Sequence, residues 1–240
     1  QDTTRYGIDM YGKKMLPQLI QNISKISGIE WIRLLYCYPE ELTDEIINEI
    51  VVNDKVCKYI DIPIQHISDS ILKLMGRRGR KLDIIKNIDK LRNKVEGIAI
   101  RTTIIVGFPG ETEENFQELK DFVSNMKFDN LGVFKYSREE GTAAAEMENQ
   151  VPEEIKSARE GELMLLQQQI MSSINKSKVG SIYKVIVEGK KGELWYGRSY
   201  EMAPDIDGVV YIKCKKTLKI GNMVNVKITH SLEYDLVGVV

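Results

Sequence analysis

The polar side chains that could bind a ligand or do chemistry gather in five short stretches in the first part of the chain, residues 1–4, 38–39, 63–69, 106–112 and 135–142. Four of these stretches follow an apolar segment that predicts a β-strand. Parallel strands end at one edge of their sheet, and this edge is where ligands bind in parallel α/β proteins. We therefore expect the five stretches to share one rim.

The most distinctive of these stretches is the sequence Gly-Phe-Pro-Gly-Glu-Thr, residues 107–112. It closes the β-branched, apolar segment 98–106, which predicts a buried strand. It also precedes a helix predicted over residues 113–126, with Thr112 as its N-cap. Glycines at such a turn let the backbone come close to a ligand. A strand–helix turn that binds nothing would account for the same residues.

Arg101 lies inside the predicted apolar strand. Because unpaired burial of a guanidinium is costly, Arg101 is expected either to bind the carboxylate of a ligand or to pair with an acidic residue of the core. Beside Gln65 and Ser68, His66 predicts a ligand site. A hydrogen-bonded structural histidine and a helix N-cap at Ser68 are the alternatives. The pair of glutamates that ends at Glu140 is expected to form a solvated turn, with a carboxylate supplied to the site as the alternative.

Strands and helices alternate along this part of the chain. The strands are predicted over residues 30–36, 56–62, 98–106 and 130–134, and the helices over residues 13–25, 43–52, 68–75, 82–94 and 113–126. This alternation specifies a parallel α/β sheet with right-handed crossovers, most simply a curved sheet or an open barrel.

The last part of the chain has a different pattern. A long helix predicted over residues 153–178 leads into five short strands with no helix between them. These strands are predicted over residues 182–188, 194–199, 208–212, 223–229 and 234–239. Five short strands separated by turns predict a small OB-like barrel. We therefore expect two domains, residues 1–178 and 179–240.

The composition bounds the class of protein. Of the 240 residues, 42% are hydrophobic and 29% are charged, as in ordinary globular domains. No apolar run approaches the ~18 residues of a membrane span. The three cysteines lie far apart and without metal-ligand spacing, which indicates a reducing compartment and a cytoplasmic protein. They are Cys37, Cys57 and Cys214.

The charge is spread unevenly. Residues 176–240 carry eleven Lys and Arg and seven Asp and Glu, a net charge of +4, whereas the whole chain has a net charge of -1. Four lysines of this region gather within seven positions, at Lys213, Lys215, Lys216 and Lys219. They predict contact with RNA or with a ribosomal partner, and a solvated surface loop is the alternative.

Five motifs, in their order along the chain, resemble the methylthiotransferases of the radical S-adenosylmethionine class: QDTTRYG, RLLYCYP, DIPIQHISDSILKLMGR, RTTIIVGFPGETEENF and FKYSREEGTAA. The stretch APDIDG and the ending YDLVG resemble the TRAM domain of that family. The resemblance covers essentially the whole chain. It implies a partial, open, TIM-like parallel β/α barrel of the radical S-adenosylmethionine type, followed by a small all-β, OB-like TRAM barrel.

Within this family, the chain resembles the branch that modifies a ribosomal protein, notably in the Tyr38-Pro39 pair and in the stretches 65–69 and 136–142. That branch methylthiolates the β-carbon of an aspartate in small-subunit ribosomal protein S12, which would be the partner of the TRAM-like domain. The transfer-RNA branch, which methylthiolates adenosine, is one alternative. A non-catalytic module that binds RNA or the ribosome is the other.

The resemblance implies S-adenosylmethionine and two 4Fe-4S clusters as cofactors, one cluster being held by a CxxxCxxC loop. The chain contains no such loop, and it opens at Gln1 rather than at a methionine. We therefore expect a fragment of a longer protein, with the cluster loop upstream of Gln1. By itself the fragment is expected to bind no cluster and to be inactive.

The resemblance also implies an S-adenosylmethionine site, built from three of the five stretches and from the strand at residues 98–106. The methionyl end would contact Gln1, Asp2 and Thr3, and the ribose and sulfonium would contact Gln65, His66 and Ser68. Arg101 would bind the carboxylate of the cofactor. The adenine would contact Val106, Gly107, Phe108, Gly110 and Glu111.

Overall fold

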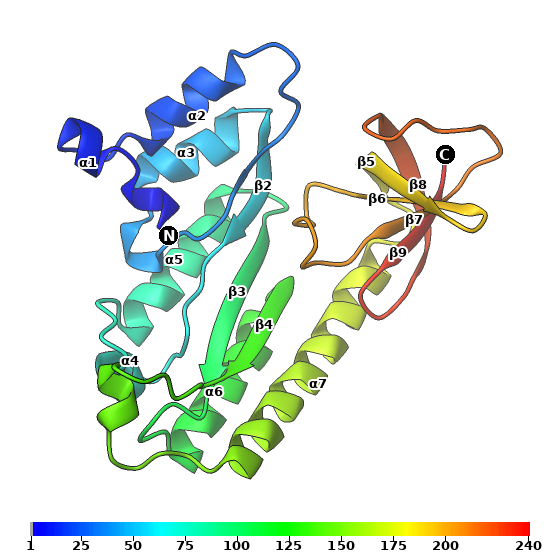
Figure 1. Cartoon of the computed structure of the whole chain (residues 1–240). Helices are drawn as coiled ribbons and strands as arrows, with labels where there is room; N and C mark the ends of the chain where they lie inside the picture. The colour runs from blue at the N-terminus through cyan, green and yellow to red at the C-terminus, as the bar shows by residue number, and fades with distance from the viewer. Residues whose placement is uncertain (1) are drawn as a thin grey trace. The chain divides into compact units, whose positions relative to one another are not determined.

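The computed structural model describes residues 2–240, which form two compact units that divide between Gln167 and Gln168 (Figure 1). In the first unit, four parallel strands form one sheet in the order β1-β2-β3-β4. They are β1 (Ile32–Leu34), β2 (Val56–Asp61), β3 (Ala99–Val106) and β4 (Asn130–Lys135). The prediction of a parallel sheet with these four strands is confirmed.

Helices connect the strands, and Figure 1 shows α5 and α6 behind the sheet. The helices are α1 (Ile8–Tyr11), α2 (Leu16–Ser24), α3 (Asp44–Val52), α4 (Asp69–Leu74), α5 (Lys81–Lys94), α6 (Glu113–Met126) and α7 (Glu153–Ser177), with short 3-10 turns η1 (Thr3–Arg5), η2 (Pro39–Glu41) and η3 (Ala143–Glu146). Along β3, Ile100, Thr102 and Ile104 are fully buried, whereas Arg101 and Thr103 are half-buried. Successive side chains of a strand point to opposite faces, so Arg101 belongs to the more open face of the sheet.

The N-terminus of α6 is capped as the sequence predicts. The Thr112 Oγ1 accepts a hydrogen bond from the Asn115 N–H over 3.3 Å, and the Asn115 Oδ1 accepts one from the Thr112 N–H over 3.1 Å. This reciprocal pair satisfies two backbone donors that a helix start leaves without partners.

Replacing the cap should destabilise the first unit. We expect Thr112→Ala to lower the free energy of unfolding by about 1 kcal/mol, because the Asn115 N–H loses its acceptor. Thr112→Ser keeps a hydroxyl acceptor and serves as the matched control. Urea denaturation followed by circular dichroism measures both variants. Equal stability of the alanine and serine variants would contradict the capping role.

The second unit is a closed barrel of five strands in the order β5-β6-β7-β9-β8. They are β5 (Ile182–Lys191), β6 (Leu194–Arg198), β7 (Val210–Lys213), β8 (Met223–Ser231) and β9 (Leu236–Val239). The core is filled by fully buried side chains, among them Val185, Val187, Val210, Ile212, Val226 and Leu236. The predicted small OB-like barrel is thus confirmed. In the part of the chain that the structure describes, no helix is long and apolar enough to cross a membrane.

Candidate functional site

Backbone hydrogen bonds gather the predicted stretches at the carboxyl edge of the first sheet. The Thr3 N–H donates to the carbonyl of Tyr36, just beyond β1, over 3.1 Å. Gln65, beyond β2, makes a further parallel bridge to β3. The Tyr136 N–H, just beyond β4, donates to the last carbonyl of β3 over 2.9 Å. The residues around this edge, here called the rim, therefore come from segments that are far apart in the sequence. Gln1, a predicted member, lies outside the described residues.

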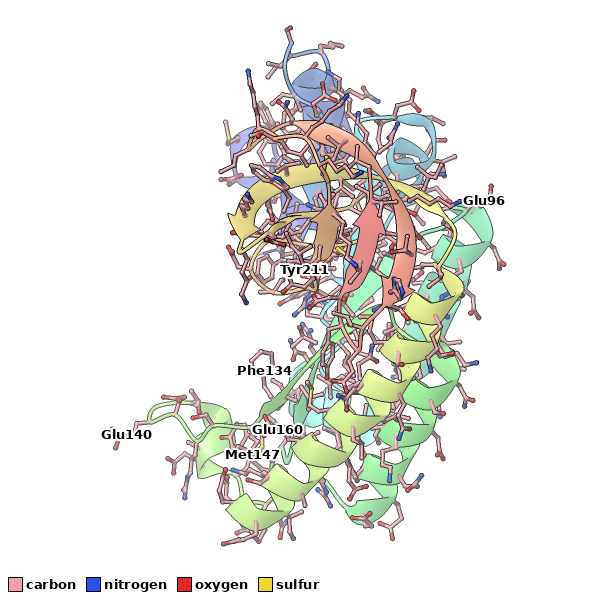
Figure 2. The ribbon with its side chains drawn as sticks, turned by 90° about the vertical axis from the view of Figure 1, so that its right-hand side faces the viewer. Glu96, Phe134, Glu140, Met147, Glu160 and Tyr211 are labelled. Carbon is pink, nitrogen blue, oxygen red and sulfur yellow. The ribbon has the colours of Figure 1, made fainter. Side chains whose placement is uncertain are left out.

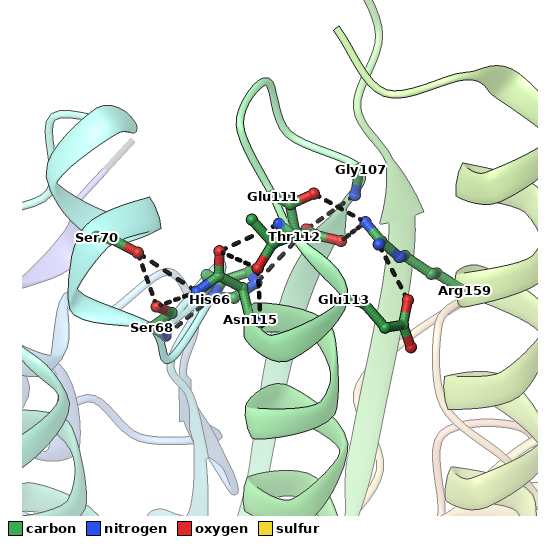
Figure 3. Close-up of polar contacts among 9 residues, drawn as sticks. All are labelled: His66, Ser68, Ser70, Gly107, Glu111, Thr112, Glu113, Asn115 and Arg159. Carbon is green, nitrogen blue, oxygen red and sulfur yellow. Dashed lines mark hydrogen bonds and ion pairs between the residues drawn. The ribbon is translucent and has the colours of Figure 1, made fainter. Parts of the chain in front are cut away.

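A buried carboxylate organises the glycine turn that follows β3 (Figure 3). The side chain of Glu111 has no exposed surface. Its Oε2 accepts a hydrogen bond from the Gly107 N–H over 2.9 Å, and its Oε1 accepts one from Nη1 of Arg159 over 2.7 Å. Arg159 also reaches Glu113, with 3.3 Å between Nη2 and Oε2. Glu111 thus joins the turn to the guanidinium of α7.

His66 lies against this carboxylate. The His66 side chain is fully buried, and its Nδ1 accepts a hydrogen bond from the Ser68 N–H over 3.0 Å. An acceptor at Nδ1 places the proton of the neutral ring on Nε2, which lies 3.5 Å from Oε2 of Glu111. Ser68 stands at the N-cap of α4 without a side-chain capping bond, and its Oγ accepts from Asn115. These contacts correspond to the structural alternative for His66, and the cofactor contacts of His66, Ser68 and Glu111 stay predictions.

Several rim residues keep buried polar atoms that have no hydrogen-bond partner among the described residues. Two of these atoms are carbonyl or carboxylate acceptors, Oε1 of Gln65 and Oδ2 of Asp2, and the others include Nε2 of His66 and the hydroxyl of Tyr136. Gln65 also has a φ of 70°, in the left-handed region that residues other than glycine rarely adopt. Strained backbone and unsatisfied buried acceptors both occur preferentially at ligand sites. These acceptors suit a ligand that donates hydrogen bonds, such as one with hydroxyl or ammonium groups.

Arg101 pairs with an acidic residue of the core. Its Nε lies 3.8 Å from Oδ1 of Asp61, and its side chain is 12% exposed. The other carboxylate oxygen of Asp61 accepts a hydrogen bond from the Tyr36 N–H over 2.9 Å. On the neighbouring strand, a Cβ added at Gly132 would lie 3.3 Å from Nη2 of Arg101. The sequence left an acidic core partner open as one alternative, and the structure shows this pair. Binding of a ligand carboxylate by Arg101 stays a prediction.

The glycine turn has room for glycine only. Gly107 has a φ of 70°, and a Cβ added there would lie 2.3 Å from Cγ of Lys156. Next to it, the ring of Phe108 meets the ring of Tyr136 edge to face, with 5.2 Å between the centroids. Both rings are buried together with Ile71. The turn therefore has a close-packed backbone beside a buried, apolar and aromatic cluster, and the adenine contacts of Gly107 and Phe108 stay predictions.

The glutamates after β4 lie outside this arrangement. Glu139 and Glu140 are exposed, and Figure 2 shows Glu140 pointing away at the tip of the segment that follows β4. This position corresponds to the solvated turn favoured by the sequence.

Comparisons with known proteins identify both domains of the chain. Residues 8–123 match the Radical SAM superfamily, and residues 179–240 match the TRAM domain. Over all 240 residues, the chain is 72% identical to the ribosomal protein uS12 methylthiotransferase RimO of Clostridium kluyveri and 63% identical to the protein of the same name in Clostridium botulinum (strain Langeland). The chain belongs to the radical SAM methylthiotransferase family. It spans 54% of the length of each of these two relatives, so it corresponds to about half of them.

A solved radical SAM enzyme has the same fold. Coproporphyrinogen III oxidase (HemN) from Escherichia coli superposes on 77% of the chain and 50% of its own length, with a TM-score of 0.51 and 12% identity. At this identity the likeness concerns the fold alone. Together with the TRAM match, it confirms the predicted radical SAM type of partial barrel followed by a TRAM barrel.

The cysteines of the chain do not fit an iron–sulfur cluster of the kind that radical SAM enzymes use. In the described part of the chain, no group of three or more His, Cys, Asp and Glu could hold a metal ion. Burial, with the carboxylates of Asp61 and Asp2, raises the pKa of the Cys37 thiol to about 12, and burial raises the pKa of Cys57. A raised pKa disfavours the thiolate form that ligates iron.

In the TRAM-type barrel, the predicted basic loop borders a cleft of about 740 Å³. Three of the four lysines line it, Lys213, Lys215 and Lys216, together with Glu193, Leu194, Cys214, Val239 and Val240. Lys219 is exposed but is not part of this lining. A basic cleft suits an anionic group of a partner.

Sequence reasoning missed three residues that shape the rim: Asp61, Lys156 and Arg159. Asp61 lies at the end of a predicted strand, and a position at a strand end was a usable signal. Lys156 and Arg159 lie on a helix rich in glutamate and glutamine, where nothing in the local pattern marks a buried cation.

Proposed function

We propose that this chain is part of a radical SAM methylthiotransferase that modifies the β-carbon of an aspartate in small-subunit ribosomal protein S12. The observation that carries the proposal is the 72% identity over all 240 residues with a protein named for that ribosomal substrate. The rim supports the S-adenosylmethionine site independently, because it combines a close-packed glycine turn with unsatisfied buried acceptors, and Arg101 adds a cation earlier on β3.

Within the proposal, the residues of this chain bind and orient S-adenosylmethionine, which supplies the radical and methyl-transfer chemistry when it is bound. Arg101 binds its carboxylate, and the unsatisfied oxygens of Asp2 and Gln65 accept hydrogen bonds from its ammonium and ribose groups. The backbone of Gly107 and the ring of Phe108 face the adenine. The half-buried position of Arg101 and the buried acceptors support these roles.

We further propose that the cluster cysteines belong to residues outside this chain, and that the chain by itself is inactive. The separation and the raised pKa of Cys37 and Cys57 support this. After anaerobic treatment with iron and sulfide, the purified chain should stay colourless, because dispersed cysteines cannot surround a cluster. A brown protein with charge-transfer absorption would contradict the proposal.

The TRAM-like domain, residues 179–240, is proposed to contact the ribosomal protein or the subunit around it. The cleft bordered by Lys213, Lys215 and Lys216 supports an anionic contact. The same basic character favours the second candidate function, a methylthiotransferase that acts on adenosine in transfer RNA.

The two candidates differ in substrate, so one experiment separates them. In a strain that lacks the full-length gene, mass spectrometry should find S12 without its methylthio group and bulk transfer RNA unchanged. Re-expression of the full-length protein should restore the modification of S12. Loss of methylthio-adenosine from transfer RNA, with S12 unaffected, would establish the second candidate instead.

A further inference from the structure

Two buried cations of α7 reach the rim from the same face of the helix. Lys156 and Arg159 are three positions apart, and each residue is at most 7% exposed. Residues at this spacing lie on one face of a helix. Each cation contacts the segment after a different strand, so one helix holds two segments of the rim.

Arg159 holds the turn after β3 at several points. Its Nη1 donates to Oε1 of Glu111 over 2.7 Å and to the Glu111 carbonyl over 3.3 Å, and its guanidinium lies 5.2 Å from the centre of the Phe116 ring. The carboxylate that it fixes is the acceptor of the Gly107 N–H. Arg159 therefore orients the backbone of Gly107 through one intermediate residue.

Lys156 binds the segment after β4 and also packs against the glycine turn after β3. Its Nζ donates to the Tyr136 carbonyl over 3.0 Å and lies 5.2 Å from the centre of the Tyr136 ring. Its aliphatic stem fills the space into which a Cβ at Gly107 would project. The segments after β3 and after β4 are thus fixed against each other by one side chain.

We propose that Lys156 and Arg159 are positioning residues for cofactor binding, which set the backbone of the Gly107 turn through Glu111 and Tyr136. The inference rests on the proposed S-adenosylmethionine site. It adds that the helix after the barrel, rather than the rim alone, determines whether the turn is ordered for binding. If the turn is ordered in only a fraction of molecules, the apparent affinity falls by that fraction.

The competing explanation is that Lys156 and Arg159 only pack α7 against the sheet and do not order the turn. Another buried residue of α7 provides a matched control. Gln167, also on α7 and 2% exposed, donates from Nε2 to the Phe128 carbonyl over 2.9 Å. Phe128 precedes β4, at the edge of the sheet opposite to the rim. Gln167→Met therefore removes a buried hydrogen bond of α7 and leaves the rim contacts in place.

The test uses the full-length protein and two measurements. Hydrogen exchange with mass spectrometry, on the protein without cofactor, follows the peptide that contains Gly107. Calorimetry with S-adenosylmethionine measures the affinity of the reconstituted protein. It is done well below the melting temperature, where a variant with lower global stability is still folded and its affinity is not changed by that loss of stability. We expect Arg159→Met to speed exchange of this peptide and to weaken binding, each about 10-fold. Gln167→Met should change neither, although it lowers the melting temperature.

Further variants test the role of Arg159 even if one substitution prevents folding. If Arg159→Met does not fold, Arg159→Lys retains a cation and should show the same effects at smaller size. Since Arg159 acts through Glu111, Glu111→Gln combined with Arg159→Met should bind no more weakly than Glu111→Gln alone. If the Arg159 variants match Gln167→Met in both measurements, α7 merely docks and the inference is wrong. If the wild-type protein does not bind S-adenosylmethionine at all, the proposed function fails, and the exchange data still decide whether Arg159 orders the turn.

Discussion

Replacing Gly107 by alanine should weaken binding of S-adenosylmethionine by the full-length protein by at least about 10-fold. The added Cβ would lie 2.3 Å from Cγ of the buried Lys156, so the lysine stem or the turn must move. The φ of 70° is also unfavourable for a residue with a side chain. A positive φ and a displaced neighbour together should cost about 1–3 kcal/mol of stability. Calorimetry measures the affinity, and thermal melting measures the stability.

Gly141→Ala is the matched control for this prediction. Gly141 has a φ of 77°, and a Cβ added there would meet nothing within 4 Å. This substitution introduces comparable backbone strain in an exposed segment, without crowding at the rim. It should lower stability slightly and leave the affinity unchanged. An affinity of Gly107→Ala equal to that of the wild type would show that the turn does not face the cofactor.

Local sequence signals were sufficient to predict the strands and helices that position the rim residues. The β-branched segment before Gly107 predicts β3, and the cap at Thr112 predicts the start of α6, because both depend on residues close together in the chain. The five strands of the small barrel are also marked locally, by turns at short intervals. In each case the signal and the structure that it predicts lie within one segment.

The partners of the buried charges could not be predicted in this way. Glu111 and Arg159 are 48 positions apart, and their contact depends on how α7 packs against the sheet. A helix rich in charged residues predicts a solvated connector, because most such residues are exposed. The pair between Arg101 and Asp61 is also set by strand register, which places the two residues side by side on β2 and β3. A sequence pattern shows that a buried cation needs an anion, and only the fold shows which anion it meets.

Replacing Arg101 by lysine in the full-length protein should weaken S-adenosylmethionine binding and leave the fold and the cluster content intact. Arg101 stands on the more open face of β3, and its side chain is 12% exposed beside Asp61. A planar guanidinium can hold a carboxylate with two parallel hydrogen bonds, and an ammonium cannot reproduce this geometry. Loss of one charge-assisted hydrogen bond should cost about 1.5–3 kcal/mol, which is roughly 10-fold or more in affinity.

Asp61→Asn separates this role from that of a core ion pair. The substitution removes the charge that Arg101 meets inside the protein and keeps an acceptor for the Tyr36 N–H. If Arg101 binds the cofactor, Asp61→Asn should retain most of the affinity, and Arg101→Lys should lose it. If Arg101 serves only its partner in the core, both variants should lose similar stability and neither should change the affinity. Calorimetric titration of S-adenosylmethionine into the wild type and both variants, with melting curves of each, distinguishes the two outcomes.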